Sequence, residues 1–196
     1  LRMNRLQESI EEEEWKVREG LSQKVAAYEK LLLENGKRIG ILDRTYAKAQ
    51  LALNRQLVKP EILEEHRIEL KEGRHLEVES LLERKGKEYC PVSFLLEPGV
   101  TCITGANMGG KTVSLKLAGL VALMTQYGFF VPASQAKVGL SSYIQMLIGD
   151  SQSLERGLSS FGGEMEELRE ALDHSQEKTL LLIDEIASGT NPKEGT

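Results

Sequence analysis

Apolar side chains in the N-terminal part of the chain recur with the period of an α-helix. Over residues 1–35 they are spaced mainly by three, four or seven positions, at Leu6, Ile10, Val17, Leu21, Val25, Tyr28 and Leu32. Asn35 and Gly36 form a helix-stop signal, and a second helical pattern over residues 38–56 is closed by Pro60. The pattern therefore predicts an αα-hairpin joined by a tight Asn-Gly turn, which needs a partner domain or chain to bury its faces.

The spacing of apolar positions changes near Arg67. Residues 68–70 and residues 75–79 alternate apolar and polar side chains, which predicts strands of a sheet with one face in water. We therefore expect a helical segment over residues 1–63 and a second domain over residues 64–196.

Strand-like and helix-like patterns alternate in this second domain. Residues 100–104 form an apolar, β-prone run, and residues 113–124 and 161–172 each carry an apolar face with helical spacing. Residues 179–184, TLLLID, form a continuous apolar run that ends in an acid. A strand that is hydrophobic on both faces belongs in the middle of a parallel sheet covered by helices, so the expected fold class is α/β.

The composition of the chain limits the classes of protein to which it can belong. A length of 196 residues with 40% hydrophobic content is enough for a buried core, and no run approaches a membrane span or a signal peptide. The formal net charge of −5 gives no overall footprint for nucleic acid, so any such contact must be local or lie elsewhere. Cys90 and Cys102 are unpatterned thiols, which fits a cytoplasmic protein, and Cys102 is expected to be a buried strand residue. The start at Leu1 and the end at Thr196 suggest a part of a longer protein.

The strongest chemical motif lies between the β-prone run and the helix that follows it. Gly105, Gly110, Lys111 and Thr112 satisfy G-x-x-x-x-G-K-[ST], the pattern of a phosphate-binding loop. Glycines let backbone N–H groups curl around an anion, and the start of the helix adds the positive end of its dipole. Lys111 would contact the β- and γ-phosphates, and the Thr112 hydroxyl would be a Mg²⁺ ligand. The competing interpretation is an ordinary strand, glycine-rich turn and helix.

An acidic pair, Asp184 and Glu185, follows the last apolar run. Mg²⁺ bridging nucleotide phosphates needs a carboxylate from a neighbouring strand, which makes Asp184 the candidate on the metal side. Glu185 is placed to polarise the attacking water in hydrolysis. The alternative is a strand end in a loop, but the phosphate-loop motif upstream favours the site.

Segments in order along the chain resemble motifs of the MutS family. Residues 104–112, TGANMGGKT, resemble the family's TGPNMGGKS/T phosphate loop, with Ala106 where proline is usual. Residues 73–75, GRH, resemble its GRHP motif, with Leu76 in place of proline. Three further matches are residues 127–133, the STF…EM-like residues 157–165, and the DEIGRGT-like residues 184–190. The helical segment also resembles the end of the family's lever region.

Within the family, the resemblance leans toward the second, recombination-associated MutS lineage. Residues 111–116, 148–153 and 189–195 are closer to that lineage's GKTVTLK, IGDEQS and GTDPxEG than to repair MutS. Met108 is shared instead with repair MutS, and residues 186–188 fit neither lineage. These departures leave room for a divergent subgroup whose target is not mismatched DNA.

The resemblance implies the N-terminal portion of an ABC-type P-loop ATPase domain, with flanking helices, in which a homodimer sandwiches two ATP molecules. Ser159 would contact the γ-phosphate in trans, although it could instead be a plain helix cap. Asn107 would lie near the γ-phosphate and its water, although a turn-forming asparagine is the alternative. The implied ATP contacts are Gly105, Ala106, Asn107, Met108, Gly109, Gly110, Lys111, Thr112 and Val113.

The sequence leaves two functions open. One is a DNA-dependent ATPase clamp, acting on mismatched or branched DNA through regions outside this chain. The other is an ATPase that remodels or reactivates a protein partner, which the acidic helices and the departures from both lineages motivate. In either case we expect the chain alone to hydrolyse ATP poorly.

Overall fold

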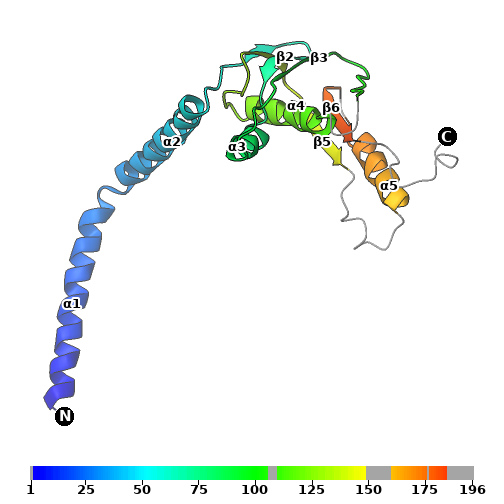
Figure 1. Cartoon of the computed structure of the whole chain (residues 1–196). Helices are drawn as coiled ribbons and strands as arrows, with labels where there is room; N and C mark the ends of the chain where they lie inside the picture. Colours follow the sequence, from blue (N-terminus) through cyan, green and yellow to red (C-terminus); the bar gives the residue numbers. More distant parts are fainter. Residues whose placement is uncertain (1, 106–109, 149–159, 176, 185–196) are drawn as a thin grey trace. The chain divides into compact units, whose positions relative to one another are not determined.

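The computed structural model describes residues 2–105, 110–148, 160–175 and 177–184 (Figure 1). The chain divides into two compact units, Leu1–Ala49 and Gln50–Thr196. Among the described residues, no helix combines the length and the apolar character that crossing a membrane would require.

The first unit is helical, but its break is not where the sequence predicts. Helix α1 spans Arg2–Ala26 and helix α2 spans Glu29–Asn54, so Asn35 and Gly36 lie inside α2 and the predicted Asn-Gly turn is wrong. Glycine and asparagine cost a helix only about 1 kcal/mol or less each, which flanking residues can offset. The ion pair between Arg38 Nη2 and Glu34 Oε1, 2.6 Å apart, spans the two weak positions.

The second unit contains a four-stranded sheet with the strand order β1-β4-β2-β3. Its strands are β1 (Glu61–Leu63), β2 (Ile68–Gly73), β3 (Val92–Leu96) and β4 (Gln135–Gly139). Strand β2 runs antiparallel to both β3 and β4, whereas β1 runs parallel to β4. The parallel pairing of β1 with β4 places residues 61–63 in this sheet.

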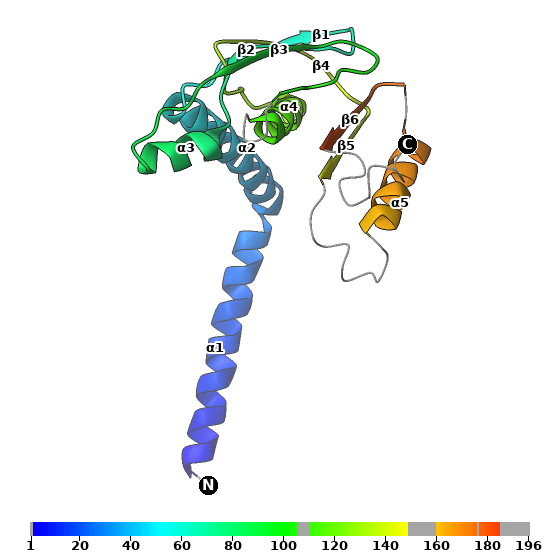
Figure 2. The same cartoon turned by 45° about the vertical axis from the view of Figure 1, so that its right-hand side comes forward.

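Helix α4 (Lys111–Gln126) packs against the four-stranded sheet (Figure 2). The apolar face predicted from the sequence is confirmed, because Leu117 and Val121 are fully buried. Together with Ala122 of the same helix, they join a core with residues of β2, β4 and the segment before β4: Ile68, Leu70, Val131, Ala133, Ala136 and Val138. Gly128 ends the helix with φ +69°, and its N–H donates to the Thr125 carbonyl as in a Schellman cap.

Strands β5 (Tyr143–Ile148) and β6 (Thr179–Asp184) form a separate parallel pair. Helix α4 contacts β6 and helix α5 (Ser160–Asp173) contacts β5, so the pair lies between the two helices (Figure 2). The strand predicted over residues 179–184 and the helix predicted over residues 161–172 are confirmed. Within the described chain, β6 has β5 as its strand neighbour and is not a central strand.

Two predicted strands are absent from the structure. Residues 75–79 lead into helix α3 (Leu76–Arg84), since a short alternation of apolar and polar residues is also compatible with a helical turn. Glu77 and Glu79 favour the helix because acids in a first turn complement its dipole. Residues 100–104 have no regular secondary structure, and Cys102 is exposed rather than buried. A β-prone segment becomes a strand only when it is paired, and these residues have no strand partner in the described chain.

The mixture of helices and sheets expected from the sequence is confirmed. The arrangement of a complete P-loop ATPase sheet stays a prediction, as does the division at residues 63 and 64.

Candidate nucleotide site

The described part of the phosphate-loop motif sits at the start of helix α4. Gly110 is the N-cap residue and has left-handed φ +84°, a conformation that a side chain would strain. Its carbonyl accepts hydrogen bonds from the Ser114 N–H at 2.8 Å and the Ser114 hydroxyl at 3.0 Å. Lys111 and Thr112, both half-buried, form the first turn, where the helix dipole favours an anion.

A cavity of about 680 Å³ brings the two halves of the predicted site together. Lys111, at the start of α4, and Asp184, the last residue of β6, both line it. Its remaining walls are mostly apolar and come from α4, β6 and the segment over residues 96–103. A lysine and a carboxylate in the lining of a mostly apolar cavity match what a nucleotide with a bound cation requires.

The donor set suits Mg²⁺. Magnesium in nucleotide sites is held by one or two protein oxygens, by phosphate oxygens and by water, so one hydroxyl and one carboxylate suffice. Thr112 and Asp184 would supply those two oxygens; Asp184 lines the cavity, whereas Thr112 is not among its lining residues. The described chain contains no cluster of three or more His, Cys, Asp or Glu side chains that could hold a metal without a nucleotide.

Several predicted site residues lie outside the described residues, and their roles stay predictions. They are Ala106, Asn107, Met108, Gly109, Ser159 and Glu185. Gly105 is described and ends the segment before the loop, and Val113 follows Thr112 in α4 as a half-buried residue.

The cavity also includes His66, which the sequence analysis missed. Its Nε2 lies 2.9 Å from the Ser141 hydroxyl, and burial lowers the pKa of His66, with positive Lys178 as a second cause. Lys178 Nζ donates to the Glu64 carbonyl at 2.9 Å, which holds it nearby. No motif could have indicated this contact, because His66 and Ser141 are 75 positions apart and each reads as a polar turn residue.

Ser141 also fixes the far end of α4. Gln126 Nε2 donates to the Ser141 carbonyl at 2.7 Å, and the Ser141 N–H donates to Gln126 Oε1 at 3.2 Å. Helix α4 is therefore held at its C-terminal end by a pair of reciprocal hydrogen bonds, while its N-terminal end faces the cavity.

Comparison with known proteins finds similarity to one family over both parts of the chain. The family model described as MutS domain V matches residues 101–196, a range that includes the phosphate-loop motif and the acidic pair. The chain is 38% identical to Endonuclease MutS2 of Pediococcus pentosaceus over 196 residues, which cover 100% of this chain and 24% of that protein. Endonuclease MutS2 of Lactiplantibacillus plantarum is 34% identical over 196 residues, again 100% of this chain and 24% of that protein.

A relative with a different name is similar over a shorter range. DNA mismatch repair protein MutS of Thermodesulfovibrio yellowstonii is 37% identical over 171 residues, which cover 84% of this chain and 20% of that protein. The chain thus spans about a quarter, or less, of the length of these curated relatives.

Proposed function

Because this chain belongs to the MutS family and is MutS2-like, we propose that it forms part of a Mg²⁺-dependent ATPase that binds and hydrolyses ATP. One observation carries the proposal. The phosphate-loop lysine at the start of α4 and the carboxylate at the end of β6 line the same cavity. The motif and the fold therefore point to the same chemistry from two distant parts of the sequence.

Each residue has a distinct role in this proposal. The loop over residues 105–113 binds the ATP phosphates, and Lys111 neutralises charge on the β- and γ-phosphates. Thr112 and Asp184 hold Mg²⁺, which draws charge from the phosphate oxygens when bound. Glu185 polarises the attacking water, and Asn107 orients it near the γ-phosphate.

We further propose an ABC-type arrangement in which a homodimer completes each ATP site. Ser159 of one chain would contact the γ-phosphate bound to the other, because serine at a helix start presents donors to an anion. Hydrolysis would then depend on dimerisation.

We infer that ATP hydrolysis is coupled to DNA repair or recombination, on mismatched or branched DNA. The similarity to Endonuclease MutS2 and to DNA mismatch repair protein MutS supports a role connected with DNA. Because the formal net charge of −5 gives this chain no overall footprint for nucleic acid, we expect the main DNA contacts to lie in other parts of the protein. The same acidity is the observation that favours the second candidate, an ATPase that remodels or reactivates a protein partner.

The substitution Lys111→Ala tests the nucleotide site. We expect its Kd for MgATP to rise by about one to two decades, because a charge-assisted contact to phosphate of roughly 1.5–3 kcal/mol is lost. Isothermal titration calorimetry measures this change. Lys116→Ala removes an exposed lysine from the same helix and should leave the Kd unchanged. Equal affinities for Lys111→Ala and the unaltered protein would exclude the phosphate-loop assignment.

A further inference from the structure

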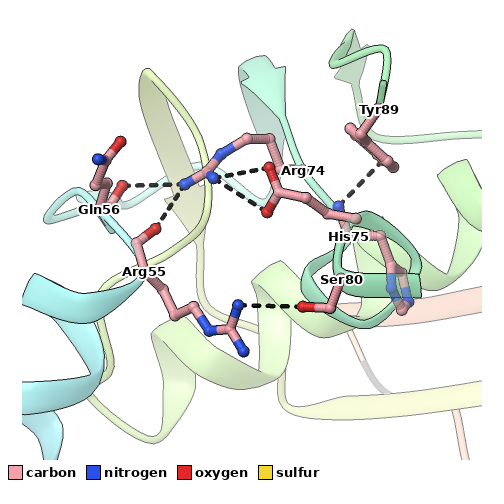
Figure 3. A network of polar contacts seen from close by, with 7 residues as sticks. Arg55, Gln56, Arg74, His75, Ser80 and Tyr89 are labelled. Atoms are coloured by element: carbon pink, nitrogen blue, oxygen red, sulfur yellow. Dashed lines mark hydrogen bonds and ion pairs between the residues drawn. The ribbon is translucent and has the colours of Figure 1, made fainter. Parts of the chain in front are cut away.

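Arg74 lies within the second unit, where strand β2, helix α3 and the residues directly after helix α2 meet (Figure 3). It follows β2, precedes α3 and contacts the residues that end α2. Its Nη1 donates to both carboxylate oxygens of Glu79, at 2.9 and 3.1 Å. Its Nη2 donates to the backbone carbonyls of Arg55 at 2.7 Å and Gln56 at 3.2 Å. The side chains of Arg74 and Glu79 are only 22% and 15% exposed, so water screens this pair less than a surface ion pair.

The two carbonyls that Arg74 contacts close helix α2. The Leu57 N–H donates to the Ala52 carbonyl at 2.9 Å, and the Gln56 N–H donates to the Leu53 carbonyl at 3.4 Å, the pattern of a Schellman cap. The last carbonyls of a helix lack partners within it, and its C-terminal end attracts positive charge. The guanidinium group of Arg74 satisfies both needs. A lysine could supply the charge but not the planar fork.

The backbone around Arg74 is constrained on both sides of the contact. Among the described residues, Gln56 at φ +51° and Glu72 at φ +48° are the non-glycine residues with positive φ. Gln56 accepts a hydrogen bond from Arg74, and Glu72 precedes it by two positions, where the pairing of β2 with β3 is irregular. Such conformations cost about 1–3 kcal/mol and cluster where structure is switched or held for function. Both non-glycine strained residues of the described chain therefore flank one side chain.

The same segment is packed tightly against the helix that carries Lys111. Gly73, directly before Arg74, is buried, and a Cβ added there would lie 3.0 Å from Leu117 Cδ2 of α4. The Arg74 N–H donates to the Pro132 carbonyl at 2.8 Å. The segment that carries Arg74 therefore lies directly against helix α4 at Leu117.

We propose that Arg74 is a positioning residue that couples the end of helix α2 to the nucleotide site, through β2 and α4. This inference rests on the proposed ATPase function and adds the route by which bound nucleotide is sensed outside the site. A nucleotide that pulls on the start of α4 shifts Gly73 and Arg74, and the guanidinium fork passes the shift to the cap of α2.

Hydrogen–deuterium exchange of the protein at its full natural length, with and without MgATP, tests this coupling. The readout is the ATP-dependent change in amide exchange over residues 51–58, compared between the unaltered protein and Arg74→Lys. We expect Arg74→Lys to bind MgATP with unchanged affinity, because Arg74 does not line the cavity. Its ATP-dependent change should fall about tenfold, because the fork to the α2 carbonyls is lost. Simple loosening would raise exchange equally with and without ATP and would leave this difference unchanged.

Two further variants sharpen the result. Arg84→Lys makes the same substitution at an exposed arginine in the last turn of α3 and should behave like the unaltered protein. Glu79→Gln removes the carboxylate that holds the Arg74 guanidinium group, so it should reduce the ATP-dependent change in exchange as Arg74→Lys does. This second variant keeps the test available if Arg74→Lys does not fold. An ATP-dependent change that persists in Arg74→Lys or in Glu79→Gln overturns the proposal. The proposal is also overturned if the unaltered protein binds MgATP and amide exchange over residues 51–58 does not change. If the unaltered protein does not bind MgATP, the proposed ATPase function itself is overturned.

Discussion

Burial of the His66 imidazole gives the second unit a stability that depends on pH. The pKa of His66 is lowered from its ordinary value of 6.5, so the unfolded chain binds a proton that the folded chain excludes. The free energy of unfolding should therefore decrease as the pH falls below 6.5, down to the lowered pKa, and this contribution is fully present above 6.5. One proton limits the slope to about 1.4 kcal/mol per pH unit.

Urea unfolding between pH 5 and pH 8 measures this dependence. The variant His66→Gln keeps a side chain that can hydrogen-bond to Ser141 but does not titrate, so its curve should be flatter than that of the unaltered protein. If His66→Gln keeps the slope of the unaltered protein, another group is responsible.

The packing of helix α4 on strand β6 depends on a glycine. A Cβ at Gly119 would lie 2.6 Å from Met146 Cε and 2.9 Å from Leu182 Cδ1, so the helix can approach the strands only where no side chain intervenes. We expect Gly119→Val to lower the free energy of unfolding by about 1–3 kcal/mol through overpacking. Urea unfolding followed by circular dichroism measures the change.

The matched control for this helix contact is Gly36→Val in α2. Nothing lies within 4 Å of a Cβ added at Gly36, so the substitution tests helix propensity without packing. It should be neutral or slightly stabilising, since valine is a better helix former than glycine. A similar loss of stability in both variants would show that packing against β6 is not the cause.

Local signals in the sequence predict the elements whose pattern is long or continuous. The apolar face of α4, the strand β6 and the helix α5 are examples, because their patterns extend over several helical turns or a full strand. Short patterns fail, as at residues 75–79, where alternation could belong to a strand or to the start of α3. The helix end predicted at Asn35 and Gly36 is wrong for another reason. Residues of low helix propensity do not end a helix when the residues on both sides strongly favour it.

Contacts between distant residues could not be predicted. The sheet order β1-β4-β2-β3 and the contact of His66 with Ser141 join segments with no local signature. For the candidate site, sequence motifs predicted Lys111 and Asp184, whereas the cavity that they share became visible only in the fold. The contacts of Arg74 with the carbonyls after α2 could not be predicted either, because the triplet GRH does not indicate which carbonyls the arginine will contact.

At the scale of the whole molecule, the two candidate functions predict different partners for the proposed ATP-bound state. The variant Glu185→Gln should slow hydrolysis about 10²-fold or more by removing the group that polarises water, and so hold the protein in that state. We expect its fluorescence anisotropy with labelled homoduplex, mismatched and four-way DNA to show a preference for one form. A clamp with six or more phosphate contacts should lose about 10³-fold or more in affinity between 50 and 200 mM salt.

The double variant Lys111→Ala, Glu185→Gln is the control, because it should neither hold ATP nor show the DNA preference. Absence of binding to every DNA form at low salt would contradict the DNA clamp. It would support the protein-remodelling candidate, and a pull-down with the ATP-trapped variant would then search for the partner.

The exposure of Cys102 makes the cavity that Lys111 lines accessible to thiol-reactive reagents. This thiol lines the cavity together with Lys111, and Cys90 is the second exposed thiol of the chain. Replacing Cys90 by serine leaves one native attachment point for a fluorophore or spin label, beside the phosphate loop and without an engineered cysteine. The segment that failed to form the predicted strand thus provides a built-in position from which spectroscopy can follow the site.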